Sequence, residues 1–123
     1  MSALAQYYLA RGWRVSGSDV ARSEITDDLK RRGVKIFIGQ KAKNVRDAEL
    51  VIYSAAIKSN NPELAAVLKS GVQTKSYAQA VGELTKKYYT IAISGSHGKS
   101  TTTALIGLIL IKAGLDPTII IGT

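Results

Sequence analysis

Short apolar segments alternate with helical segments along the whole of this 123-residue chain. The apolar runs and turn residues predict strands at residues 13–16, 34–38, 50–53, 72–74, 88–94 and 118–121. Helices are expected at residues 3–11, 23–32, 62–70, 77–85 and 99–113. Several strands are apolar without two-residue alternation, which is typical of parallel strands buried beneath helices on both faces. The expected fold class is therefore α/β, with a parallel sheet covered by helices.

The chain is strongly basic, with 17 Lys and Arg residues against 9 Asp and Glu residues and a formal net charge of +8. These basic residues are dispersed, and no basic helix or aromatic-laced strand of the kind that stacks bases is present. We therefore expect no nucleic-acid partner, and anionic small-molecule substrates explain the charge better.

Several other classes of protein are excluded by composition. The chain has no Cys and one His, so it offers neither a disulfide framework nor a cluster of cysteine or imidazole metal ligands. The first residues lack the pattern of a signal peptide, and the longest apolar run, residues 104–111, is far shorter than a membrane span. We expect a cytoplasmic protein without a membrane partner.

A domain boundary is expected near residues 85–87, which divides the chain into residues 1–85 and 86–123. The first part carries about four strands with their helices, whereas the second is one strand–loop–helix–strand unit, too small to bury its own faces. The helix over residues 101–110 is apolar nearly all round and needs cover. We expect most of one domain followed by the opening of a second.

The sharpest functional signal is the run IAISGSHGKSTTT at residues 91–103, a strand, a Gly-rich turn and a helix start. Gly95 and Gly98 allow successive backbone N–H groups to converge on phosphate oxygens, and the helix N-terminus adds unpaired donors. Lys99 supplies a charge for the outer phosphates, and the Ser100 hydroxyl is the expected Mg²⁺ ligand. The usual G-x-x-x-x-G-K-[ST] pattern has Gly where this chain has Ile93, so the match is to a shortened form. The alternative is a chance Gly-Lys-Ser at an ordinary helix start.

A second nucleotide site is indicated more weakly by two residues at strand ends. Asp19 follows a strand where dinucleotide-binding folds place an acidic residue on a ribose hydroxyl, although a turn residue or helix cap explains Asp19 better when it is taken alone. Ser54 opens the small-residue run SAAI after another strand, where ligands of open parallel sheets bind. The alternative there is a tight turn.

Aromatic pairs and the single histidine allow further alternatives. The pairs at residues 7–8 and 88–89 could form a stacking platform, but packing in the core or on a strand face explains them better. His97 could be a general base, but its place inside the Gly-rich turn favours a role in shaping the loop.

Residues 95–103 (GSHGKSTTT) resemble the ATP loop of the Mur ligases, which favour G-T-[HN]-G-K-T-T. His at the third place is similar to the branch that joins L-alanine to UDP-N-acetylmuramate and to the related murein-peptide ligases. Further matches are MSALA at residues 1–5, SGSD at 16–19, SAAI at 54–57, NPE at 61–63 and AGLDPT at 113–118. The resemblance covers essentially the whole chain.

The resemblance implies a Rossmann-like UDP-binding domain, a central ATPase domain and a C-terminal domain that brings the amino acid. It implies that ATP phosphorylates the muramoyl carboxylate and that L-alanine attacks the acyl phosphate, during cytoplasmic peptidoglycan synthesis. The implied cofactors are ATP and Mg²⁺, with Lys99 as the catalytic residue, Ser100 on the metal, and Asp19 and Ser54 near the UDP moiety. The implied triphosphate-binding residues are Gly95, Ser96, His97, Gly98, Lys99, Ser100 and Thr101.

The chain departs from the family pattern at both ends. The family's first strand and G-x-G-G-x-G turn have no counterpart before Met1, so we expect a sheet without its first strand. The family's acidic Mg²⁺ ligands, adenine pocket and C-terminal domain have none before Thr123, so we expect an N-terminal part that is inactive without the rest of the ligase chain. The alternatives are a murein-peptide ligase or other Mur-type ligase, a non-catalytic nucleotide-binding module, or another P-loop kinase or ATPase.

Overall fold

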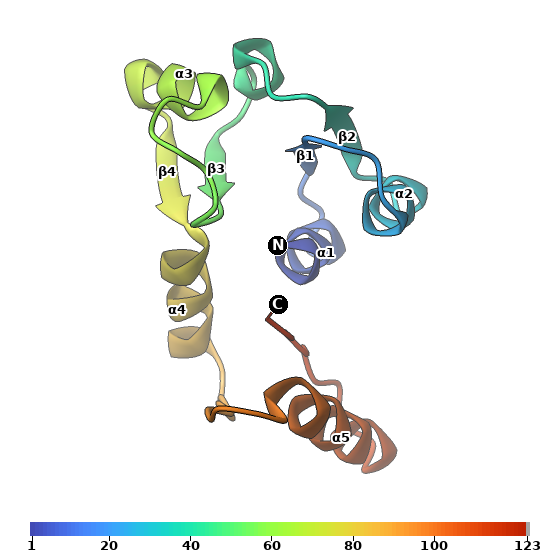
Figure 1. Ribbon diagram of the computed structural model, residues 1–123. Coiled ribbons are helices and arrows are strands. Elements are labelled where there is room, and N and C mark those ends of the chain that lie inside the picture. The colour runs from blue at the N-terminus through green and yellow to red at the C-terminus, as the bar shows by residue number, and fades with distance from the viewer. Residues whose placement is uncertain (123) are drawn as a thin grey trace. The chain divides into compact units, whose positions relative to one another are not determined.

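Helices and short strands alternate in the computed structural model, which describes residues 1–122 (Figure 1). The chain divides into two compact units, Met1–Tyr88 and the residues from Tyr89 onward. The elements of the first unit are α1 (Ser2–Ala10), β1 (Ser16–Asp19), α2 (Glu24–Arg31), β2 (Lys35–Ile38), the 3₁₀ helix η1 (Ala42–Val45), β3 (Leu50–Tyr53), α3 (Pro62–Ser70), β4 (Gln73–Ser76) and α4 (Tyr77–Lys87). The second unit contains α5 (Lys99–Lys112).

The strands pair in parallel, which confirms the predicted α/β class. β1 pairs with β2 from Ser16 opposite Lys35 to Asp19 opposite Ile38. β3 pairs with β4 in the same sense, starting with Leu50 opposite Gln73. Within the described residues these pairs form two separate two-stranded sheets, so the expected parallel strands lie in two ladders and not in one.

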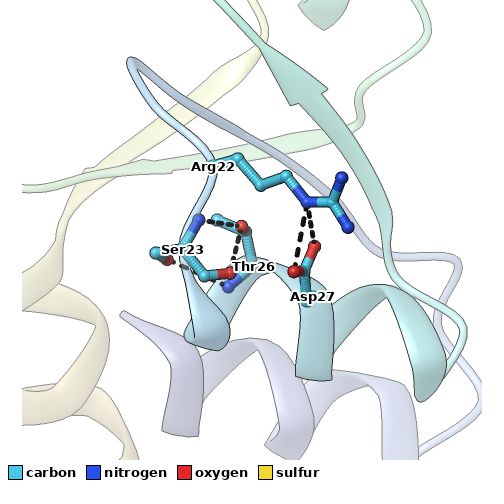
Figure 2. Close-up of polar contacts among 4 residues, drawn as sticks. All are labelled: Arg22, Ser23, Thr26 and Asp27. Carbon is cyan, nitrogen blue, oxygen red and sulfur yellow. Dashed lines mark hydrogen bonds and ion pairs between the residues drawn. The ribbon is translucent and has the colours of Figure 1, made fainter.

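Polar side chains fix where the helices begin. At the start of α2, the Ser23 hydroxyl accepts from the Thr26 N–H at 3.2 Å while the Thr26 hydroxyl accepts from the Ser23 N–H at 2.8 Å (Figure 2). This reciprocal capping satisfies two donors that a helix start leaves unpaired. Arg22 also pairs with Asp27 at 2.8 Å, beside the capping residues. At α3, Asn61 caps the first turn and Pro62 occupies the first helical position.

The hydrophobic core lies in the first unit and is built from the helices and from the residue that precedes β2. Val34 and Val67 are 2% and 1% exposed, and Leu84 of α4 is 7% exposed. The buried apolar residues are Leu4, Tyr7, Leu29, Val34, Val67, Ala80 and Leu84. The buried polar residue Thr26 is satisfied by the capping contacts of α2.

The predicted strands at residues 88–94 and 118–121 are wrong in the described structure, where neither segment joins a ladder. A strand is stabilised by its neighbours, and no neighbouring strand pairs with either segment there. Ile91 accordingly remains 51% exposed. In the second segment, Ile119 packs over Gly107 of α5, so this segment provides part of the cover that the apolar helix needs.

Three other predicted strands begin later than expected, among them β2, which begins at Lys35 and not at Val34. The Trp13 N–H donates to the Tyr8 carbonyl oxygen at 3.2 Å, which ties residue 13 to the end of α1 and moves the start of the strand to Ser16. β4 begins at Gln73 and not at Val72. α4 extends to Lys87, two residues beyond its predicted end. No helix among the described residues is long and apolar enough to cross a bilayer.

Candidate functional site

The Gly-rich turn before α5 has a backbone that only glycine adopts readily. Gly95 has φ +150° and Gly98 has φ +76°, both in the region that disfavours L side chains. Gly98 is the N-cap of α5 and, as a glycine, has no side chain that could accept a bond from the first turn. The N–H groups at this helix start therefore lack the side-chain acceptor that usually satisfies them, and such donors suit an anion.

Lys99 folds back over the same turn. Its Nζ donates to the Gly95 carbonyl oxygen at 2.6 Å and approaches the Ser96 carbonyl oxygen at 3.4 Å. The ammonium group is therefore held close to the backbone of the turn. Ser96, His97, Ser100 and the rest of this turn are exposed, and the turn lies wholly within the second unit.

The hydroxyl groups at the start of α5 differ in availability. The Thr103 hydroxyl donates to the Lys99 carbonyl oxygen at 2.8 Å and is used within the helix. Ser100, the expected metal ligand, is exposed in the first turn. Across residues 1–122 no group of three or more acidic, His or Cys residues is placed to hold a metal. A hydroxyl such as that of Ser100 is the kind of oxygen ligand that Mg²⁺ accepts.

Asp19 and Ser54 belong to the first unit, apart from the Gly-rich turn in sequence. Asp19 ends β1 and is exposed, and its Oδ1 accepts a long bond of 3.4 Å from the Ala21 N–H. Its carbonyl oxygen accepts from the Gly39 N–H at 2.8 Å. Ser54 follows β3, and its carbonyl oxygen accepts from the Ile57 N–H at 3.1 Å in a turn. Both residues lie at carboxyl ends of parallel strands, as the sequence predicts.

A hydrogen-bonded group around Glu63 was not given a role by the sequence. The Ser18 hydroxyl donates to Glu63 Oε2 at 2.5 Å, and the Asn44 amide donates to Glu63 Oε1 at 2.6 Å. Ser18 and Glu63 also line a cleft of about 120 Å³ with residues 16–17 of β1 and residues 50–52 of β3. The NPE motif marked Glu63, but only the structure shows that its carboxylate joins α3 to β1.

Three of the four paired tyrosines, Tyr7, Tyr8 and Tyr88, pack or form hydrogen bonds within the first unit, whereas Tyr89 is 98% exposed. Tyr7 lies edge-to-face with Tyr8 at 5.4 Å, and Tyr8 lies edge-to-face with Trp13 at 5.6 Å. The Tyr7 and Tyr88 hydroxyls are 2.9 Å apart, and the Arg11 guanidinium lies 3.9 Å from the centre of the Tyr7 ring and donates to the Tyr88 hydroxyl. The hydrogen bond between the two tyrosine hydroxyls raises the pKa of Tyr7. The bonds from Tyr7 and Arg11 lower the pKa of Tyr88. These contacts favour packing over a stacking platform for Tyr7, Tyr8 and Tyr88, whereas the packing expected of Tyr89 is wrong, since that side chain is exposed.

Parallel strand pairs with intervening helices, followed by a Gly-rich turn at a helix start, define an α/β protein of the kind that often binds nucleotides at such turns. Residues 1–89 match the family described as "Mur ligase family, catalytic domain". The chain belongs to the Mur ligase family. The matched region ends before Gly95, so the family match does not include the turn at the start of α5.

Individual relatives are similar over almost the whole chain. The chain is 50% identical over 123 residues to the UDP-N-acetylmuramate–L-alanine ligase of Acetivibrio thermocellus, covering 99% of this chain and 26% of that protein. Among solved structures, it matches the UDP-N-acetylmuramate–alanine ligase of Thermotoga maritima with a TM-score of 0.87 and 30% identity, over 93% of this chain and 27% of the other. A murein peptide ligase of Psychrobacter arcticus matches with a TM-score of 0.83 and 32% identity, over 93% and 24%. The chain thus spans about a quarter of the length of the relatives it matches.

Proposed function

We propose that these 123 residues are the N-terminal part of a cytoplasmic, ATP-dependent ligase that joins L-alanine to UDP-N-acetylmuramate through an acyl phosphate, in peptidoglycan precursor synthesis. The observation that carries the proposal is the 50% identity, over 99% of the chain, to a protein named for that reaction. Residues 1–85 then form the domain that binds the UDP substrate, and residues 86–123 open the ATP-binding domain.

The Gly-rich turn is assigned to the triphosphate of ATP. The positive φ of Gly95 and Gly98, the uncapped start of α5 and the Lys99 ammonium above the turn support this assignment. Lys99 stabilises negative charge on the phosphoryl group in transfer, and Ser100 supplies one oxygen ligand to Mg²⁺. Bound Mg²⁺ neutralises phosphate charge. His97 shapes the turn, and Ser96 and Thr101 complete the residues around the phosphates.

Asp19 and Ser54 are assigned to the UDP moiety. Each lies where a parallel strand ends, which is where open α/β sheets bind ligands. The exposed carboxylate of Asp19 is suited to accept a hydrogen bond from a sugar hydroxyl. The small residues after Ser54 allow close approach of a ligand.

Catalysis is expected to need the remainder of the ligase. Phosphoryl transfer depends on several parts that position substrates and metal at once. The chain spans 26% of the related Acetivibrio thermocellus ligase, and among its described residues no acidic cluster could hold a metal. We therefore expect no ligase turnover from these 123 residues by themselves.

The test is release of phosphate from ATP by the whole ligase that contains this chain. The proposal predicts release only when UDP-N-acetylmuramate and L-alanine are both present, with UDP-N-acetylmuramoyl-L-alanine as the product. A general ATPase would release phosphate without the UDP-sugar acid, and a non-catalytic module would release none. Either outcome contradicts the proposal.

A murein-peptide ligase is the second candidate function. The observation that favours it is the 32% identity and TM-score of 0.83 to the Psychrobacter arcticus enzyme. The same assay separates the two candidates, since a murein-peptide ligase requires a peptide in place of L-alanine.

A further inference from the structure

A closed ring of hydrogen bonds surrounds the carboxyl end of β1. The Ser18 hydroxyl donates to Glu63 Oε2 at 2.5 Å, and Asn44 Nδ2 donates to Glu63 Oε1 at 2.6 Å. Asn44 Nδ2 also donates to the Gly39 carbonyl oxygen at 3.0 Å, and the Gly39 N–H donates to the Asp19 carbonyl oxygen at 2.8 Å. Because Asp19 follows Ser18 in the chain, the peptide bond between these two residues joins the last of the four hydrogen bonds to the first and closes the ring.

Glu63 is the only side chain of this ring that receives bonds from two other parts of the fold. Ser18 belongs to β1, Asn44 to η1, and Glu63 itself to the first turn of α3. The Lys41 N–H adds a longer approach of 3.4 Å to Glu63 Oε1. Both carboxylate oxygens are therefore occupied by donors of the protein, which leaves Glu63 suited to hold the structure and not to serve as a base or metal ligand.

The side chain of Asp19 has the opposite character. It is exposed, and the bond that it accepts, from the Ala21 N–H, is long at 3.4 Å. Its backbone, by contrast, is held on both sides, through Ser18 and through Gly39. A carboxylate that is free on a fixed backbone is pre-organised to accept a hydrogen bond from a ligand hydroxyl.

We propose that Glu63 is a positioning residue: by closing this ring it fixes the backbone of Asp19, so that the Asp19 carboxylate accepts a hydrogen bond from a sugar hydroxyl of the UDP substrate. The inference rests on the proposed function, which assigns Asp19 to that substrate. It adds a role for Glu63, whose motif had none.

The ring itself is tested without any ligand, by hydrogen exchange of the Gly39 amide in this chain. Glu63→Ala removes the acceptor of two bonds and is expected to speed exchange at Gly39 by about tenfold. In Glu63→Gln the side-chain oxygen still accepts from Asn44, and the new amide nitrogen donates to the Ser18 hydroxyl, which rotates to accept. The ring is therefore kept, and exchange of the Gly39 amide should stay near the wild-type rate. Glu83→Ala removes a carboxylate of α4 outside the ring and is the matched control. Unchanged exchange at Gly39 in Glu63→Ala overturns the inference.

If Glu63→Ala does not fold, Ser18→Ala opens the ring at its other contact and is expected to speed Gly39 exchange in the same way. Ser18 is partly buried and loses only a hydroxyl, so the fold is retained. Unchanged Gly39 exchange in this variant also overturns the inference.

The functional consequence is tested in the whole ligase by a double-mutant cycle. Glu63→Ala is expected to raise KM for UDP-N-acetylmuramate about tenfold while KM for ATP and kcat stay unchanged, with rescue by Glu63→Gln. Asp19→Asn raises the same KM, and the double variant is no worse than Asp19→Asn, because Glu63 acts through Asp19. Additive losses overturn the inference. An Asp19→Asn variant with unchanged KM contradicts the substrate assignment of Asp19, even where Gly39 exchange shows the ring intact.

Discussion

At the scale of single residues, the structure separates side chains that hold the fold from those free to act on a ligand. Glu63 has both oxygens engaged by protein donors, whereas the Asp19 carboxylate accepts one long bond. Lys99 lies between these two cases, because its ammonium group bonds to carbonyl oxygens of the turn and also lies beside the expected phosphate position. The number and length of these bonds are the basis on which we propose Glu63 as a positioning residue and Asp19 as a binding residue.

Asp28 provides a prediction on pH at this scale. Its hydrogen bond from Arg32, at 2.7 Å, and the nearby Arg31 lower the pKa of Asp28. A lowered pKa means that Asp28 stabilises the fold above the ordinary carboxyl pKa and that this contribution is lost as pH falls through the folded-state value. Carboxyl titration by NMR should give Asp28 a midpoint below that of ordinary Asp, which moves up in Arg32→Ala. An unchanged midpoint in that variant would contradict the ion pair.

At the scale of elements, the helices follow from sequence better than the strands. Capping residues act locally, so Ser23 and the Asn61–Pro62 pair predict the starts of α2 and α3 within a residue. A strand requires a neighbour, which is why the apolar run at residues 88–94 joins no ladder in the described structure. The bonds that Glu63 accepts from Ser18 and Asn44 also join residues distant in sequence, so the sequence by itself does not predict them.

Gly82 of α4 is predicted to be a site of stabilisation. It lies inside the helix, its φ is not positive, and a Cβ built there meets no atom within 4 Å. Gly82→Ala should raise the free energy of unfolding by roughly 0.5–1 kcal/mol, because alanine loses less backbone entropy in a helix. Urea denaturation measures the change, and a loss of stability would show that the space around Gly82 is filled.

Gly107 of α5 is predicted to behave in the opposite way. A Cβ there would overlap the side chain of Ile119, so Gly107→Ala forces the two apart. We expect α5 to lose about 1–3 kcal/mol of protection in amide exchange, the usual cost of overpacking. Ile119→Ala removes the obstructing atoms, and the double variant should lose less than the sum of the single changes. Additive losses would mean that the two residues are not in contact.

At the scale of the whole molecule, the chain consists of two units that meet in sequence at Tyr88 and Tyr89. Tyr88 is tied to α1 by its bonds to Tyr7 and Arg11, whereas Tyr89 is 98% exposed. The sequence predicts a boundary near residues 85–87 from the elements on either side of it, and the roles of the two parts stay predictions.

Proteolysis tests this division. Chymotrypsin at low concentration should cleave first after Tyr89, because its side chain is exposed and it directly follows the first unit. Mass spectrometry should then identify a fragment of residues 1–89, and Tyr89→Ala should slow its appearance. Initial cleavage inside residues 1–87 would contradict a compact first unit.

The assignment of the Gly-rich turn to the triphosphate is tested most directly by the effect of Mg-ATP on thermal unfolding of the chain and of its Lys99→Ala variant. A ligand at free concentration c that binds only the folded state stabilises it by RT ln(1 + c/Kd), so the melting temperature rises as the ligand concentration exceeds its Kd. We predict a rise for the wild type and for Lys112→Ala, a control at the other end of α5, and no rise for Lys99→Ala. Equal rises in melting temperature for the wild type and for Lys99→Ala, or no rise for the wild type, would contradict the phosphate site on which the ligase proposal depends.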